Sequence, residues 1–120
     1  MAGDAPPLTV KTLTNTDKTV LGQPLVLPRD HPAVVVSTYD IAPGARLPRH
    51  KHPFSRFAYV LAGDLTVAFD DGVQHRYHAG DVIVEAVDSW HYGANTGTVP
   101  VRLLVIDLVE AGQPTTILAK

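Results

Sequence analysis

The sequence predicts an all-β fold, and three observations lead to this prediction. Ten prolines and nine glycines are scattered along the 120 residues, and these residue types punctuate short strands. Val and Thr are frequent between them, and β-branched residues favour strands. No window carries a sustained apolar period of about 3.6 residues between helix caps. Short strands separated by frequent turn signals favour a sandwich or barrel, of which the jelly roll is the natural closed form.

Strong strand signals occur in the first third of the chain. We expect strands at residues 8–14, 19–27 and 33–41. Residues 15–18 would make the first turn, and Pro24 indicates that the second strand is irregular or lies at an edge. The third strand is closed by the Pro43-Gly44 turn.

The remainder continues the same pattern. Further strands are expected at residues 56–61, 65–69, 73–78, 82–85 and 101–109. Asp70-Asp71-Gly72 is a strong hairpin signal. Residues 115–118 would add an edge strand, on this chain or on a neighbouring subunit.

Composition restricts the function classes. The net charge of −2 gives no basic surplus for nucleic acid, and no apolar run approaches the roughly 20 residues of a membrane span. No cysteine is present, which excludes disulfides and thiolate ligands. The length predicts one domain, residues 1–120. We expect residues 1–7 to be flexible. They are compatible with the N-terminus of a cytoplasmic protein or with the processed N-terminus of a periplasmic or secreted one, so the sequence does not determine the compartment.

Two histidines between a proline-rich turn and a strand are the first candidate ligands. Residues two apart on an extended chain share a face, so His50 and His52 would point both imidazoles the same way. Neutral imidazole suits Zn, Cu, Fe and Ni. The alternative is a pair of surface histidines among basic neighbours such as Lys51. A metal site needs a third ligand from elsewhere.

The stretch around this pair resembles the first motif of the cupin superfamily, which are small jelly-roll barrels with an internal metal site. That motif is a glycine, a His-x-His pair, a glutamate and a second glycine. Gly44, His50, His52 and Gly63 fall in register, and Arg56 occupies the glutamate position.

A later stretch resembles the second cupin motif. Gly80, His91 and Asn95 match it, whereas Ala86 and Asp88 replace its proline and second glycine. The resemblance covers residues 34–110 and implies a double-stranded β-helix, or jelly-roll barrel.

The resemblance also implies a metal centre. His50, His52 and His91 would hold a divalent transition metal (Fe, Mn, Ni, Zn or Cu), with positions left open for water or substrate. The alternative is a degenerate site whose histidines are hydrogen-bonded to one another or vacant.

Arg56 departs from the family pattern. Arginine has no acceptor and keeps its proton, so it cannot coordinate a metal. An unpaired guanidinium about 5 Å from a dication would cost roughly 6–7 kcal/mol at an effective dielectric of about 20. Four arrangements would avoid this cost. Arg56 would turn to solvent, it would pair with an acid, the metal would be absent, or an anion would bridge the guanidinium and the metal. The last option makes it a candidate catalytic residue for a carboxylate-bearing substrate.

Other side chains are weaker candidates. His75 and His78 are expected on the surface. Glu85 and Asp88 are the acids nearest to His91 in the sequence, and either could support the site, although we expect both to be exposed to solvent. Four aromatic residues could line the cavity mouth or an interface, with packing as the default: Phe57, Tyr59, Trp90 and Tyr92. The apolar pocket wall is expected to comprise Ala58, Val60 and Val84.

Three functions remain open. The first is a metal-dependent dioxygenase or related oxidoreductase acting on a small anion. The second is a non-catalytic module that binds a small molecule or metal, and the third is a metal-free, isomerase-like cupin with His50 or His91 as acid or base. By resemblance we also expect a homodimer.

Overall fold

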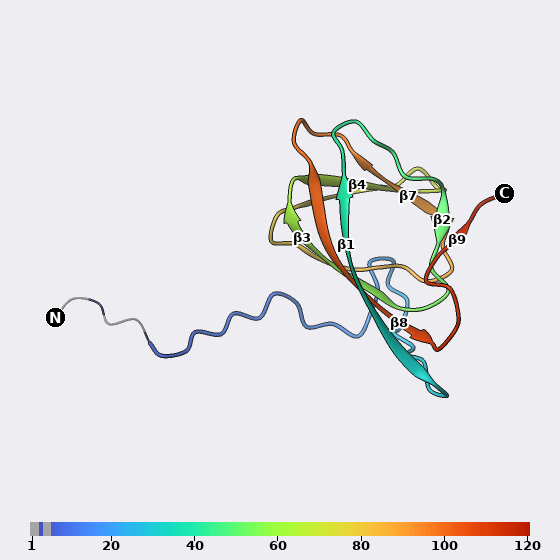
Figure 1. The fold of residues 1–120 in the computed structure, drawn as a ribbon, viewed down its shortest axis with the longest axis horizontal. Coiled ribbons are helices and arrows are strands. Elements are labelled where there is room, and N and C mark those ends of the chain that lie inside the picture. Colours follow the sequence, from blue (N-terminus) through green and yellow to red (C-terminus); the bar gives the residue numbers. More distant parts are fainter. Residues whose placement is uncertain (1–2, 4–5) are drawn as a thin grey trace.

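Two antiparallel sheets make up the body of the molecule (Figure 1). The computed structural model describes residues 3 and 6–120, and within them it has nine strands and no helix. We expected residues 1–7 to be flexible, and four of these, residues 1–2 and 4–5, lie outside the described residues. No helix in the described chain is long and apolar enough to cross a membrane.

The first sheet has the order β1-β8-β3-β6. Its strands are β1 (Pro32–Ile41), β8 (Val101–Glu110), β3 (Arg56–Ala62) and β6 (Val82–Val84). Strand β8 alternates buried and less buried positions, as expected for a strand with one face on a core. Its register with β3 places Asp107 directly beside Arg56.

The second sheet has the order β5-β4-β7-β2-β9. Its strands are β5 (Gln74–His78), β4 (Asp64–Phe69), β7 (His91–Asn95), β2 (His50–Lys51) and β9 (Ile117–Leu118). The register of β2 with β7 pairs His50 with His91. Segments some forty residues apart in the chain therefore meet at this ladder.

The core lies between the inner faces of the two sheets. Val60 and Val101 are fully buried from the first sheet, and Leu65 and Val67 are buried from the second. Each side chain of this size contributes about 1.5–3 kcal/mol when fully buried. This is the predicted jelly-roll arrangement, and most of its buried side chains are apolar.

Gly63 joins β3 to β4 where the backbone is crowded. It has φ +81°, and a Cβ at this position would lie 2.6 Å from the carbonyl oxygen of Pro100. The second glycine of the first motif is therefore required for both its conformation and its lack of a side chain.

Most of the predicted strands are confirmed, with ends that differ by at most one residue. The confirmed segments are 33–41, 56–61, 65–69, 73–78, 82–85 and 101–109. Residues 70–72 make the predicted hairpin turn, in which the Gly72 amide donates to the Phe69 carbonyl at 2.9 Å. The expectation for residues 115–118 is met only at Ile117 and Leu118, which pair with β2 of the same chain.

The strands predicted at 8–14 and 19–27 are wrong. Residues 6–18 form an exposed arm, with Leu8 76% and Val10 77% exposed. The first part of the arm extends away from the barrel (Figure 1), and residues 11–14 border β5 and β6 at a surface hollow. The only ladder contact in this region is an isolated bridge between Lys18 and Pro24. The residue types favour strands, but a strand needs a partner for its backbone groups, and residues 8–14 pair with no strand in the part of the chain that the structure describes.

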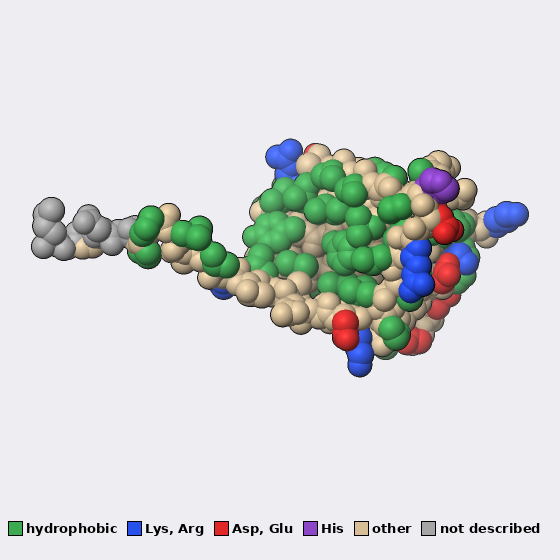
Figure 2. Space-filling view, turned by 90° about the horizontal axis from the view of Figure 1, so that it is seen from below, with side chains coloured by type: hydrophobic (Ala, Val, Ile, Leu, Met, Phe, Trp, Pro, Cys, Tyr) green, Lys and Arg blue, Asp and Glu red, His purple; other side chains and the backbone are tan. Residues whose placement is uncertain are grey.

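Hydrophobic side chains also gather on one outer face of the body, as Figure 2 shows, whereas most charged groups lie toward the end away from the arm. The edge strand β1 contributes exposed apolar residues, with Val34 63% and Val36 60% exposed.

Candidate metal centre

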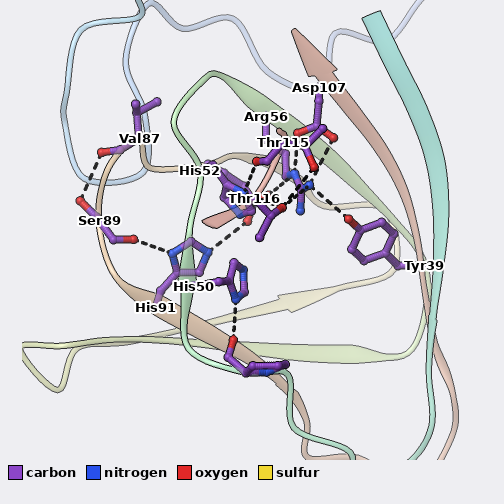
Figure 3. Close-up of polar contacts among 12 residues, drawn as sticks. Tyr39, His50, His52, Arg56, Val87, Ser89, His91, Asp107, Thr115 and Thr116 are labelled. Carbon is purple, nitrogen blue, oxygen red and sulfur yellow. Dashed lines mark hydrogen bonds and ion pairs between the residues drawn. The ribbon is translucent and has the colours of Figure 1, made fainter. Parts of the chain in front are cut away.

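Three histidines converge at one end of the barrel (Figure 3). His50 lies on β2, His52 just after it, and His91 at the start of β7. Their ring centroids are 4.4–5.0 Å apart, and their exposed fractions are 8%, 0% and 3%. The structure therefore brings together the predicted ligand set and buries it.

Each of these rings is fixed through Nδ1 by a backbone carbonyl. The Nδ1 of His50 lies 2.6 Å from the Pro48 oxygen, and that of His91 lies 2.8 Å from the Ser89 oxygen. In both cases the acceptor is two residues earlier in the chain.

His52 uses a distant segment for the same purpose. Its Nδ1 lies 3.1 Å from the carbonyl oxygen of Thr115. A carbonyl can only accept, so all three rings must carry their proton on Nδ1. Every Nε2 then has a free lone pair, which is the tautomer that a metal requires.

The histidines are neutral near pH 7. Burial lowers the pKa of all three imidazoles, and the positive charge of Arg56 lowers each further. The effect is largest for His52, whose pKa falls to about 2. Its Nε2 is buried and has no hydrogen-bond partner in the described chain. A buried imidazole nitrogen without a partner is costly unless something binds it.

The donor set fits a transition-metal ion. One nitrogen from each histidine lies within 4.8 Å of the others. Donors bound to one ion at about 2.0–2.1 Å lie roughly 3–3.5 Å apart, so only a small inward rotation of the rings is needed. The three buried histidines can hold a metal.

Arg56 lies beside this cluster and is paired with an acid. Its Nε and Nη2 donate to the two carboxylate oxygens of Asp107 at 2.7 and 3.2 Å. Nη2 also donates to the hydroxyls of Tyr39 at 3.1 Å and Thr116 at 3.2 Å (Figure 3). Of the alternatives left open by the sequence, acid pairing is the one present. Within the described chain, Nη1 makes no hydrogen bond.

Asp107 is a functional neighbour that the sequence analysis missed. It is 2% exposed and has the same strand parity as the core residues Val101, Leu103 and Val105. A charged residue in the inward register of an apolar strand was the signal that could have found it.

Glu85 corrects the expectation of a solvent-exposed turn residue. It directly follows β6, and its amide donates to the Arg56 carbonyl at 3.0 Å, so the residue extends the sheet. Its side chain is only 13% exposed and faces the histidines. Burial raises its carboxyl pKa to about 7, although the nearby Arg56 acts in the opposite direction. Asp88, in contrast, is exposed as expected.

A cavity of about 180 Å³ opens beside the cluster. His50, His91, Arg56 and Glu85 line its polar end, and Ala58 is part of its apolar wall as expected. The other two residues expected there do not line it: Val60 packs in the core and Ile83 takes the place predicted for Val84. Cavities for drug-sized ligands are about 300–1,000 Å³, so this one suits a smaller molecule.

The remaining candidates lie outside the cluster. His78 pairs with Asp64 on the surface, and His75 packs against Phe69. Trp90 lies under the guanidinium of Arg49, at 4.6 Å from the ring centroid. Tyr92 lies in the same way under Arg46, at 3.7 Å.

The comparison with protein families agrees with this architecture. A family model described as a cupin domain matches residues 37–107, more than half of the chain. Among curated proteins, none matches.

Solved structures give the same fold. An oxalate oxidase in complex with the substrate analogue glycolate is 22% identical, with a TM-score of 0.58, over 72% of this chain and 46% of its own. A protein of uncharacterised function from Klebsiella pneumoniae is 21% identical, with a TM-score of 0.58, over 89% of both chains. A sugar phosphate isomerase from Silicibacter pomeroyi is 28% identical, with a TM-score of 0.56, over 63% of this chain and 50% of its own. The chain thus spans about half the length of the oxalate oxidase and of the isomerase.

Proposed function

The chain belongs to the cupin family, and on that premise we propose that it binds one divalent transition metal and presents it to a small organic molecule. The ligands would be His50, His52 and His91. The observation that carries the proposal is the shared tautomer: three Nδ1 atoms on carbonyls leave three Nε2 lone pairs aimed at one buried point. Iron, manganese, nickel, zinc and copper all accept imidazole ligands.

The bound metal would supply open coordination positions for Lewis-acid or redox chemistry. The residues of the chain would do the rest. The backbone carbonyls hold the rings in place, and apolar side chains such as Ala58 and Leu103 keep the inner part of the cavity dry. A small molecule would enter a site whose polar groups are already oriented, which lowers the entropy cost of bringing it to the metal.

Arg56 would position the substrate. Two of its nitrogens are taken by Asp107, so its charge is largely compensated, but Nη1 has no protein partner within the described chain and the residue lines the cavity. A carboxylate oxygen is a suitable acceptor for Nη1. The proposal is therefore an oxidoreductase, such as a dioxygenase, acting on a small anionic substrate. The likeness to an oxalate oxidase that binds glycolate supports a small acid.

A metal-free isomerase is the second candidate, because a sugar phosphate isomerase is among the similar structures. In that case His50 or His91, which line the cavity, would act as acid or base. A binding module without turnover would use the same residues. We further propose a homodimer that covers the exposed apolar residues of β1.

Metal analysis of the untagged chain, purified without chelator, tests the main proposal. We expect about one equivalent of metal per chain, or one equivalent taken up from a divalent salt and retained on a desalting column. His91→Ala should retain it much less tightly, because one of the three imidazole donors is lost. His75→Ala is the matched control, since this histidine lies outside the cluster. A wild-type chain that takes up no divalent ion would overturn the proposal.

Oxygen consumption then separates enzyme from binder. The metal-loaded chain is offered a panel of small carboxylic acids, thiols and diketones. Turnover that is lost in His91→Ala and kept in His75→Ala supports the oxidoreductase. Tight binding of a compound without oxygen uptake supports the binding module instead. Isomerisation of a sugar phosphate by the metal-free chain would favour the second candidate.

A further inference from the structure

Glu85 lies with its carboxylate against the histidine cluster. Its Oε2 is 3.8 Å from the Nε2 of His52, and its Oε1 is 3.9 Å from the Nε2 of His91. These are two of the three nitrogens that would bind the proposed ion, so the carboxylate borders the same point in space from a further direction.

Hydrogen bonding within the protein does not explain this position. In the described part of the chain no hydrogen bond reaches the carboxylate of Glu85. The nearest cation is Arg56, whose Nε is 3.7 Å from Oε2, but that nitrogen already donates to Asp107 at 2.7 Å. Only 13% of the side chain is exposed, so the carboxylate has lost most of its contact with water. A mostly buried carboxylate without a donor is stabilised by a cation beside it, because otherwise its charge is relieved only by protonation.

We infer, on the basis of the proposed metal site, that Glu85 supplies a carboxylate ligand to the ion held by the three histidines. The distances from its oxygens to two of the imidazole nitrogens fall within the spread among the histidine donors themselves, which lie within 4.8 Å of one another. Carboxylate oxygen joins imidazole nitrogen in many transition-metal sites. A ligand here would also occupy the region next to His52 Nε2, the buried nitrogen that has no partner.

This assignment explains the substitution in the first motif. The resemblance places a glutamate ligand at the position of Arg56, on β3. Glu85 follows β6, the neighbouring strand, and its amide donates to the carbonyl of Arg56. The carboxylate has therefore been supplied from the adjacent strand, and the arginine at the original position is held away from the ion by Asp107 on β8. The site would thus keep one carboxylate ligand, supplied by Glu85 and not by the residue at position 56.

Binding of Co²⁺ to Glu85→Gln tests the inference. Glutamine keeps the shape but removes the charge and the preferred oxygen donor. Loss of residues that merely support a ligand costs about 10–100-fold in affinity, so loss of a direct ligand should cost at least that much. The visible spectrum of bound Co²⁺ should also change, because one donor is replaced by water. Asp88→Asn is the matched control for charge, since this exposed acid is screened by solvent and should leave both readouts unchanged.

The outcomes separate this inference from the proposed function. A wild-type chain that binds no Co²⁺ would overturn the metal site itself. A Glu85→Gln chain with wild-type affinity and spectrum would overturn only the role of Glu85. If that variant does not fold, a crystal structure of the Co²⁺-loaded wild type decides. A carboxylate oxygen at about 2.0–2.2 Å from the ion is expected, and one separated from it by water would refute the inference.

Discussion

Removing one partner of the buried ion pair between Arg56 and Asp107 should strongly destabilise the first sheet. The two residues are register partners on β3 and β8, and their exposed fractions are 4% and 2%. The guanidinium donates twice to the carboxylate, at 2.7 and 3.2 Å. Asp107→Asn keeps the shape of the acid but leaves the buried positive charge without its partner.

The expected loss is about 3 kcal/mol in the free energy of unfolding. Breaking a buried pair by removing one partner costs about 3–5 kcal/mol. The lower end applies because Glu85 lies 3.7 Å from the guanidinium and compensates part of the charge. The matched control is Asp70→Asn, which removes an acid from the exposed pair with Arg49 and should leave stability almost unchanged.

Urea unfolding of the metal-free chain, followed by circular dichroism, measures both variants. A loss of about 3 kcal/mol moves the midpoint by about 1–3 M for a slope typical of small domains. A midpoint shift no larger than that of Asp70→Asn would refute the reasoning. A double replacement, Arg56→Met with Asp107→Leu, removes both charges and should recover most of the loss. If it does not, packing at this position matters more than charge.

Two further predictions concern the backbone and assembly. Gly63→Ala should destabilise the chain far more than Gly72→Ala in thermal unfolding, because a Cβ at Gly63 would lie 2.6 Å from the oxygen of Pro100 whereas one at Gly72 meets nothing within 4 Å. Both glycines have positive φ, so equal losses would show that conformation alone sets the cost. Light scattering should give twice the chain mass of 12.9 kDa, and Val36→Lys should shift it to the monomer; a wild-type monomer would contradict the dimer.

The sequence predicted the barrel because its strands carry local signals. The long strands are rich in β-branched and other apolar residues and are followed by glycine-containing turns, such as Pro43-Gly44 after β1, and these signals indicate both position and type. The same composition at residues 8–14 was misleading, because pairing depends on a partner strand that composition does not reveal. Strand β7 was missed because Gly93 and Ala94 carry little strand propensity, and its place is set by pairing with β4.

For the site, spacing predicted His50 and His52 and the family resemblance supplied His91, but neither identified the acids. His50 and His52 are two apart on an extended segment and so share a face, and His91 is the register partner of His50 on the neighbouring strand. The partner of Arg56 depended on the register between β3 and β8, which no local pattern specifies. Glu85 was expected at the end of strand 82–85 and exposed next to a turn, whereas the chain continues in the sheet far enough to turn this side chain inward.

The C-terminal segment has a practical consequence. Thr115 holds the ring of His52, Thr116 accepts from Arg56, and Leu118 borders the cavity. A polyhistidine tag joined directly after residue 120 would bring foreign imidazoles close to the three native ones and compete with them for any ion. The arm at the opposite terminus extends away from the barrel (Figure 1), so purification handles are better placed there.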